Sequence, residues 1–243
     1  MTGAEVPLEG NRSEADTAVS LCSGKNDVEP MTLCAPAIPG ESLISQVSRY
    51  HVTSGNVTTR DTYDELFQRA PFRLTFWVPP HIASLSVWLK GELVETTHRL
   101  LRESTLFPLF KMFNGARFAP SASRESVDEA LRRQPKRIVA ESGWTRICPL
   151  CVIKDSEKYG TAVIRSAHQI PGVSHCHSHG TPLQDWCQKC RCPFERKNDL
   201  VLTPWLGCAV CEARLVGDPS QTEAVPDDSR AIGFARFAAR LLE

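Results

Sequence analysis

Eight residues between positions 148 and 211 form four pairs of metal-ligand type, each with two residues between its members. The pairs are Cys148 and Cys151, Cys176 and His179, Cys187 and Cys190, and Cys208 and Cys211. This spacing lets two side chains reach one ion, and two such pairs complete a tetrahedral Zn²⁺ site. The pattern therefore predicts two structural Zn²⁺ ions, with no coordination position left for a catalytic water.

The order of the pairs leaves two arrangements open. In consecutive pairing, the first two pairs share one ion and the last two share the other. In interleaved pairing they form the cross-brace of RING domains, which would indicate a ubiquitin-ligase module. The seven residues between His179 and Cys187 favour consecutive zinc ribbons, because a cross-brace joins these pairs through a shorter segment. His175 and His177 are alternatives to His179, and Cys192 falls outside the ligand spacing.

The remaining sequence contains no pattern typical of an active site. Serine, histidine and aspartate do not occur with the glycines of a nucleophile elbow, and no phosphate-binding loop or dinucleotide fingerprint is present. His168, in the sequence SAHQIPG, could serve as a base, but a buried structural histidine between the ligand pairs is the favoured interpretation. We therefore expect a protein that is not an enzyme.

Composition divides the 243-residue chain into four regions. Residues 1–37 contain two basic and six acidic residues, which predicts a disordered acidic leader. Residues 38–143 are predicted to form a helical domain, residues 144–215 the double zinc-binding domain, and residues 216–243 a linker and a C-terminal amphipathic helix. Cys22 and Cys34 lie in the leader and are assigned to no site.

The charge balance and the absence of export signals argue against a strongly basic nucleic-acid binder, a membrane protein and a secreted protein. Lys and Arg number 28, as do Asp and Glu, so a dense basic surface for nucleic acid is absent. No apolar stretch is long enough to span a bilayer, and the N-terminus lacks the pattern of a secretion signal. We expect no membrane association, reduced cysteines and a cytosolic location.

The fold class expected is mainly α with small zinc-ribbon elements. The N-terminal domain is either helix-turn-helix-like or a plain all-α bundle, and two consecutive zinc sites follow it. Helices are predicted over residues 43–54, 60–70 (capped by Thr58 or Thr59), 81–93, 95–104 and 127–134. A capping box at Ser126 opens the last of these. Residues 105–120 are predicted to be irregular but packed. The C-terminal helix over residues 230–243 carries Phe234, Phe237 and Leu241 on one apolar stripe and is expected to dock on the body.

Three segments resemble the TniQ/TnsD family of transposition targeting proteins, in particular its TnsD-like branch. They are residues 39–56 (PGESLIS, SRYH, SGN), residues 105–108 (TLFP) and residues 147–190, which include the sequence HQIPGV at 168–173. Two positions depart from the family pattern. Val163 and Ile164 stand where the family has an aromatic residue, and Ser104 stands where it has a histidine.

The resemblance implies a non-catalytic adaptor that marks the target site of a Tn7-like transposon. It would link target DNA, or a CRISPR effector complex, to an AAA+ transposition ATPase, and a homodimer is compatible with this role. A stand-alone zinc-ribbon DNA-binding regulator remains the alternative. From charge and family pattern, ATPase contact is expected at Pro39, Glu41 and Arg49, and contact with DNA or an effector at Arg60, Arg69, Arg73, Arg191, Arg196 and Lys197.

Overall fold

The computed structural model of the chain describes residues 37–89, 91–114, 123–133, 144–194, 200–215 and 229–242. The predictions for the leader, for Cys22 and Cys34, and for Arg196 and Lys197 lie outside these residues, as does nearly all of the linker. In the described part, helices dominate and β-structure is limited to isolated bridges. The mainly α fold with two consecutive groups of metal-ligand residues is thereby confirmed.

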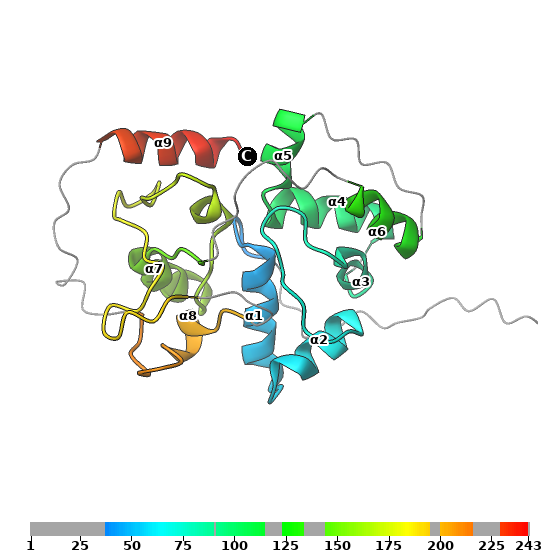
Figure 1. The fold of residues 1–243 in the computed structure, drawn as a ribbon, viewed down its shortest axis with the longest axis horizontal. Coiled ribbons are helices and arrows are strands. Elements are labelled where there is room, and N and C mark those ends of the chain that lie inside the picture. The colour runs from blue at the N-terminus through cyan, green and yellow to red at the C-terminus, as the bar shows by residue number, and fades with distance from the viewer. Residues whose placement is uncertain are drawn as a thin grey trace, which may run out of the picture.

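The helices fall into two neighbouring groups, and α1, a member of the first group, lies on the side that faces the second (Figure 1). The first group comprises α1 (Leu43–Ser54), α2 (Thr59–Phe67), α3 (Ile82–Ser86), α4 (Leu93–Ser104), α5 (Phe107–Asn114) and α6 (Arg124–Arg132). The second comprises α7 (Pro149–Tyr159), the 3-10 helix η1 (Ser166–Gln169), α8 (Thr203–Leu206) and α9 (Ser229–Arg240). None of the described helices is both long enough and apolar enough to cross a bilayer.

Helices α1 and α2 begin and end at local sequence signals. Ser42 caps α1 by accepting a hydrogen bond from the Ser45 N–H, and Gly55, with φ of 79°, ends it. Thr58 and Asp61 form a reciprocal capping box at the start of α2. Helix α2 ends at Phe67, earlier than predicted, because Gln68 adopts the left-handed conformation. Helices α1 and α2 contact each other across the short turn, which fits both a helix-turn-helix-like domain and a plain all-α bundle.

The helix predicted over residues 81–93 is wrong in length. Helix α3 ends at Ser86, whose hydroxyl donates to the Ile82 carbonyl and lies 2.9 Å from Thr97 Oγ1. Side-chain bonds of this kind compete with the backbone ladder of a helix. Helix α4 then starts anew, because the Glu92 carboxylate accepts from two N–H groups of its first turn.

The stretch after Thr105 was predicted to be irregular and is instead helix α5. The Thr105 hydroxyl accepts a hydrogen bond of 3.0 Å from the Phe107 N–H and so satisfies a donor at the start of α5. Pro108 lies in the first turn, where the missing N–H costs no hydrogen bond. The position of Pro108 makes it part of a helix start.

The start of α6 also differs from the prediction. Ser123 is the N-cap, and its hydroxyl accepts a hydrogen bond of 3.1 Å from the Ser126 N–H. The capping box predicted at Ser126 is therefore wrong, since Ser126 already lies in the first turn of a helix that runs from Arg124 to Arg132.

One hydrophobic core joins the N-terminal helices to the ligand region. Leu43, Val47 and Leu101 belong to the same buried cluster as Ile164 and Val173. A smaller apolar cluster lies around the later cysteines. The residues that carry the metal-ligand pairs are therefore held against the helices by apolar burial.

Helix α9 docks on the body, as expected, and of the predicted stripe Leu241 is partly buried against the core. Ala235 and Ala238 are buried, whereas Phe234 and Phe237 are 44% and 59% exposed. Glycines of the ligand region lie under larger side chains of α9, since a Cβ at Gly180 would lie 3.3 Å from Ile232 Cδ1 and one at Gly172 would lie 3.4 Å from Phe234 Cε1.

Candidate metal centres

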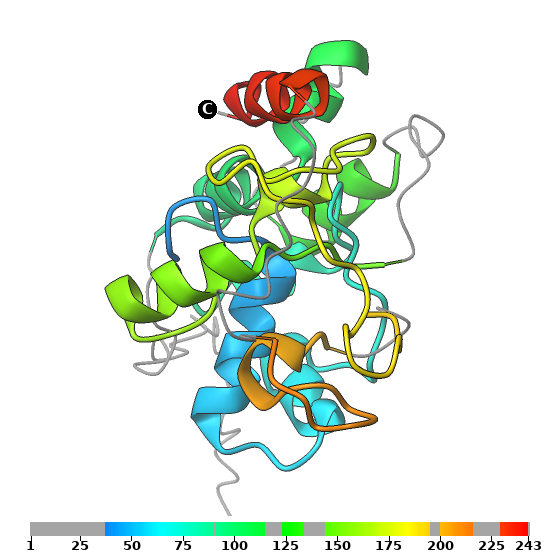
Figure 2. The ribbon, with the colours of Figure 1, turned by 90° about the vertical axis from the view of Figure 1, so that its left-hand side faces the viewer.

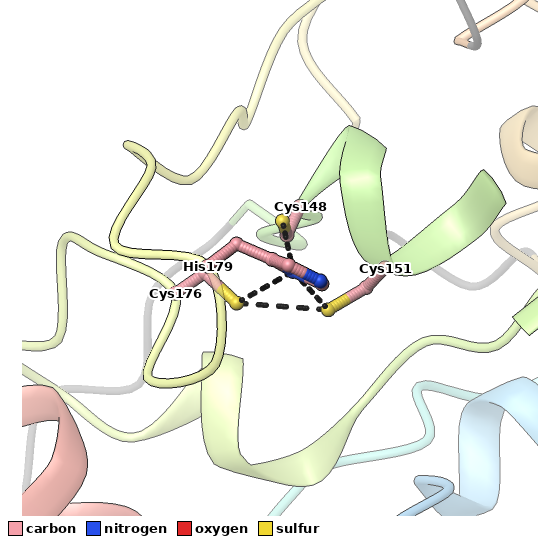
Figure 3. Close-up of side chains that lie close together, drawn as sticks. All are labelled: Cys148, Cys151, Cys176 and His179. Carbon is pink, nitrogen blue, oxygen red and sulfur yellow. Dashed lines mark hydrogen bonds between the residues drawn. The ribbon is translucent and has the colours of Figure 1, made fainter. Parts of the chain in front are cut away.

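The first four predicted ligands point toward one another (Figure 3). The Nδ1 atom of His179 lies 3.5, 3.4 and 3.5 Å from the Sγ atoms of Cys148, Cys151 and Cys176. The Sγ atoms of Cys151 and Cys176 are 3.6 Å apart. Bonds of ~2.3 Å to sulfur and ~2.0 Å to nitrogen at a tetrahedral angle place ligand atoms about 3.5 to 3.8 Å apart. The four side chains therefore fit one tetrahedral ion.

The last four predicted ligands form a second group, with all four Sγ atoms within 4.8 Å of one another. Cys187 and Cys211 are 3.6 Å apart, and Cys190 and Cys208 are 3.5 Å apart, measured between Sγ atoms. Each group thus consists of consecutive pairs, which contradicts the cross-braced RING alternative. Cys192 is outside the group, and its Sγ lies 3.8 Å from the Pro193 carbonyl.

Three of the four pairs share one backbone conformation. In each, the N–H of the residue after the pair donates at 2.8 Å to the carbonyl of the first cysteine. The N–H of that cysteine donates at 2.7 to 2.9 Å to the carbonyl of the second residue after the pair, which is Thr181, Cys192 or Ala213. The residues after the pairs are left-handed: Gly180 has φ of 69°, Arg191 of 60° and Glu212 of 58°. This tight turn directs both ligands of a pair toward the same ion.

The remaining pair, Cys148 and Cys151, lies at the N-terminus of α7. Cys148 is the N-cap, Pro149 opens the helix, and Cys151 lies in its first turn. Helix N-termini stabilise negative charge and therefore favour thiolates. Hydrogen bonds from the Cys151 and Cys176 thiols lower the pKa of Cys148, and the contact with Cys148 raises the pKa of Cys176 to about 11. A cation bound at the centre would offset the repulsion among three thiolates.

Side-chain hydrogen bonds connect the segment before the first ligand pair to the segment before the second. The Gln169 side chain accepts from the Arg146 N–H at 3.0 Å and donates to the Arg146 carbonyl at 2.6 Å. The Arg146 guanidinium in turn donates to the carbonyls of Ile170 and Val173. The residues just before Cys148 are thereby tied to the turn that precedes Cys176. This contact explains part of the HQIPGV sequence, although the role of Arg146 was not predicted.

His168 has the buried, structural position that was favoured for it. Burial lowers its pKa to about 3, so the ring is neutral near pH 7. Its Nε2 lies 3.9 Å from Cys151 Sγ, and its ring packs beside His177. His168 therefore lies against the predicted ligand Cys151, and only 1% of it is exposed.

Glu41 and Arg49, assigned by sequence to ATPase contact, are buried against each other. The Glu41 carboxylate accepts from Arg49 Nε at 3.1 Å and Nη2 at 2.9 Å, and also from Ser45 Oγ and the Ile38 N–H at 3.0 Å each. The two charges are paired inside the fold and are not exposed on the surface of the protein. Pro39, by contrast, is exposed.

The segment around Glu41 is joined to the ligand region across a long sequence separation. The Ser42 N–H and hydroxyl donate to the Ile164 carbonyl at 2.9 and 2.7 Å, and Ser45 Oγ accepts from the Ile164 N–H at 3.0 Å. Arg165 pairs with Asp155 of α7 and donates to the Pro39 carbonyl at 3.2 Å. Arg165 was missed by the sequence reasoning, because its partners are distant in the chain.

The basic residues predicted to contact DNA or an effector are on the surface where described. Arg60, Arg69 and Arg73 are exposed, and Arg60 lies 3.6 Å from Asp64. Arg191 is exposed, with its guanidinium 5.8 Å from the centre of the Trp186 ring.

Comparison with known proteins identifies the region that carries this geometry. A family model described as TniQ matches residues 33–183, which include the first ligand group and the segment joined to Ile164. The Escherichia coli protein named "Transposon Tn7 transposition protein TnsD" is 25% identical over 155 residues. That alignment covers 58% of this chain and 29% of the relative, so this chain matches less than two thirds of the relative's length.

Proposed function

The chain belongs to the TniQ family, and from this premise we propose that it is a non-catalytic adaptor that selects the target site for a Tn7-like transposon. The family match over residues 33–183 carries the proposal, and the similarity to a Tn7 transposition protein supports it. The matched region contains the buried Glu41–Arg49 pair and the complete first ligand group. In this proposal these residues build a scaffold that presents partner-binding surfaces.

Each ligand group is proposed to hold one Zn²⁺ ion. The Cys₃His and Cys₄ donor sets are typical of structural zinc, and the distances between ligand atoms suit tetrahedral coordination. When bound, the ion neutralises crowded thiolates and holds the turns that carry them. Because all four positions of each ion are filled by side chains, its proposed role is structural.

The proposed partners are target DNA or a CRISPR effector on one side and an AAA+ transposition ATPase on the other. Exposed arginines on and after α2 and at the third ligand pair are the proposed contacts with DNA or an effector: Arg60, Arg69, Arg73 and Arg191. Arg196 and Lys197, which follow Arg191 in the sequence, are proposed contacts of the same kind. For ATPase contact, the exposed Pro39 remains, while the buried Glu41 and Arg49 are withdrawn. A homodimer and a location in the bacterial cytosol complete the proposal.

A transposition assay tests the adaptor role. Donor transposon, transposase, ATPase and target plasmid are combined with and without this protein, and insertions are mapped by sequencing. We expect directed insertion only when the protein is present. Directed insertion in its absence would refute the proposal, and a change in transcription without any change in insertion would favour the stand-alone regulator.

The DNA contact is tested separately by charge reversal. Arg60→Glu combined with Arg73→Glu should weaken binding to target DNA and reduce its salt dependence, because fewer counterions are released. Arg133→Glu on α6 is a matched control, since this arginine is also exposed and paired with a glutamate one turn away. Equal binding by the double variant and the control would remove DNA from the proposed partners of this surface.

A further inference from the structure

The segment that precedes α1 forms a turn with one defined backbone conformation. The Glu41 N–H donates to the Ile38 carbonyl at 2.9 Å, and Gly40 has φ of 74°. Pro39 comes directly before Gly40, and proline followed by a left-handed glycine is typical of a type II turn. Both central residues are exposed, so the turn over residues 38–41 presents them at the surface of the protein. We call it the 38–41 turn.

Buried groups hold the 38–41 turn from the inside. The Glu41 carboxylate accepts a hydrogen bond of 3.0 Å from the Ile38 N–H, and Arg49 donates two more to the same carboxylate. The Ser166 N–H donates to the Gly40 carbonyl at 3.0 Å. Figures 1 and 2 both show the segment before α1 beside the ligand region to which it is bonded. Two exposed residues are thus held by contacts that lie inside the fold.

Arg165 joins the same turn to helix α7. Its Nη1 donates to the Pro39 carbonyl at 3.2 Å, while Nε and Nη2 donate to the Asp155 carboxylate. Only 3% of the Asp155 side chain is exposed. A Cβ at Gly40 would lie 3.3 Å from Arg165 Nη1, so the guanidinium lies directly against the turn. A guanidinium can bind a carboxylate through two N–H groups and donate another to a carbonyl, which the ammonium of a lysine cannot do in the same geometry.

The 38–41 turn also forms part of the wall of a cavity of about 600 Å³. Pro39, Gly40, Arg165 and Ser166 are among the residues that line it. The Ser166 Oγ is buried without a hydrogen-bond partner among the described residues. A partner that contacts the exposed Pro39 therefore also meets this cavity, whose shape depends on the conformation of the turn.

We propose that Arg165 is a positioning residue for partner binding, because it holds the 38–41 turn in the conformation that the partner contacts. The inference rests on the proposed function for the identity of that partner, the AAA+ ATPase, and for its contact at Pro39. A turn that is already ordered loses less conformational freedom on binding, which raises the affinity. Glu41 and Arg49 hold the turn from the inside and do not touch the partner.

The experiment measures the affinity of the full chain for the purified ATPase, without DNA, together with amide hydrogen exchange of the free chain. Arg165→Lys keeps a positive charge beside Asp155 but cannot reach the Pro39 carbonyl at the same time. We expect at least tenfold weaker ATPase binding and at least tenfold faster exchange of the Glu41 N–H. Amides of α7 should change by less than threefold, because the charge beside Asp155 is kept. Arg133→Lys, at an exposed arginine that pairs with a glutamate, is the matched control and should change neither quantity by more than twofold.

Gly40→Ala tests the same contact from the side of the turn. The added Cβ would press on Arg165 Nη1, whereas Gly160→Ala has a similar φ of 71° with nothing within 4 Å and is the matched control. We expect at least tenfold weaker ATPase binding for Gly40→Ala and less than a twofold change for Gly160→Ala. Combining Gly40→Ala with Arg165→Lys should weaken binding by no more than twofold beyond the weaker-binding single variant, because both changes break one contact.

Folding controls keep the inference testable. Zinc content and the melting temperature establish that each variant is folded. Gly40→Ala leaves Arg165 and Asp155 in place, so it tests the contact even where Arg165→Lys does not fold. Faster exchange of equal size in the turn and in α7 would mean a general loss of stability, and it would overturn the positioning role.

The remaining outcomes separate the inference from the proposed function. Wild-type affinity in Arg165→Lys overturns the inference and leaves the adaptor role intact. Weaker binding with unchanged exchange assigns Arg165 to direct contact with the partner, and additive losses in the double variant do the same for Gly40; both results overturn the positioning role. A wild-type chain that does not bind the ATPase, although directed insertion requires the chain, overturns the proposed partner and the inference with it.

Discussion

Replacing Arg49 with methionine should destabilise the protein more than any change to an exposed ion pair. Methionine keeps much of the length of the side chain but removes its charge and its donors. Glu41 has no exposed area and would keep only the hydrogen bonds from Ser45 and Ile38. The variant therefore leaves a buried carboxylate without its cation.

The expected size of the loss follows from the contacts of Arg49. Two hydrogen bonds to Glu41, at 3.1 and 2.9 Å, disappear. Bonds to charged groups contribute about 1.5 to 3 kcal/mol each. Breaking one side of a buried pair costs about 3 to 5 kcal/mol in other proteins. For a chain of this length, such a loss corresponds to a fall in melting temperature of roughly 6 to 20 °C.

The assay is urea unfolding followed by circular dichroism at saturating Zn²⁺, with Arg60→Met as the control. Arg60 lies 3.6 Å from Asp64, but the side chains are 71% and 53% exposed. Its loss should cost less than about 1 kcal/mol. Combining Arg49→Met with Glu41→Leu should recover part of the loss, because no charge is then left buried. If Arg49→Met and Arg60→Met lower the free energy of unfolding equally, burial does not govern the strength of this pair.

Three further changes test the ligand region. Elemental analysis should find two Zn²⁺ per chain, one in Cys208→Ser and two in Cys192→Ser; loss of metal from the latter would contradict the ligand assignment. Gly207→Ala should disrupt the second ligand group, because φ of Gly207 is 87° and a Cβ there would lie 2.9 Å from the Glu212 backbone oxygen. Gly55→Ala is the control: open space surrounds Gly55, so the free energy of unfolding should fall by only about 1 to 2 kcal/mol. Burial lowers the pKa of His168 from its ordinary value of ~6.5 to about 3 in the folded chain. Between these two pH values the unfolded chain binds one more proton at this residue than the folded chain does. The free energy of unfolding should therefore fall as the pH drops from ~6.5 toward 3. A His168→Gln variant with an equally steep pH dependence would argue against this origin.

The metal-ligand groups could be predicted because their information is local. Two residues separate the members of each pair, and this spacing alone brings both side chains to one ion. Helix α1 was predictable for the same reason, since Ser42 and Gly55 act within one turn of its ends. Pro108 shows the limit of local reasoning, because its effect depends on whether a helix starts before it or continues through it.

Charge and hydrophobicity misled where tertiary contacts decide. Glu41 and Arg49 were assigned to a partner from charge and family pattern, yet each is paired with the other inside the fold. Phe234 and Phe237 were assigned to the docking face of α9 because they are apolar. The fully buried residues of α9 are instead Ala235 and Ala238, and glycines of the ligand region leave room for Ile232 beside them.

The hydrogen bond between Ser42 and the Ile164 carbonyl joins residues that are 122 positions apart. At synthesis rates of roughly 5 to 20 residues per second, the ribosome needs about 6 to 25 s to add the intervening chain. During that time the nascent N-terminal helices lack the segment that covers Glu41. Cys148 and Cys151 are made shortly before Ile164, and Cys176 and His179 shortly after it. The first ligand group and the segment that closes the N-terminal region are therefore completed within one interval of biosynthesis.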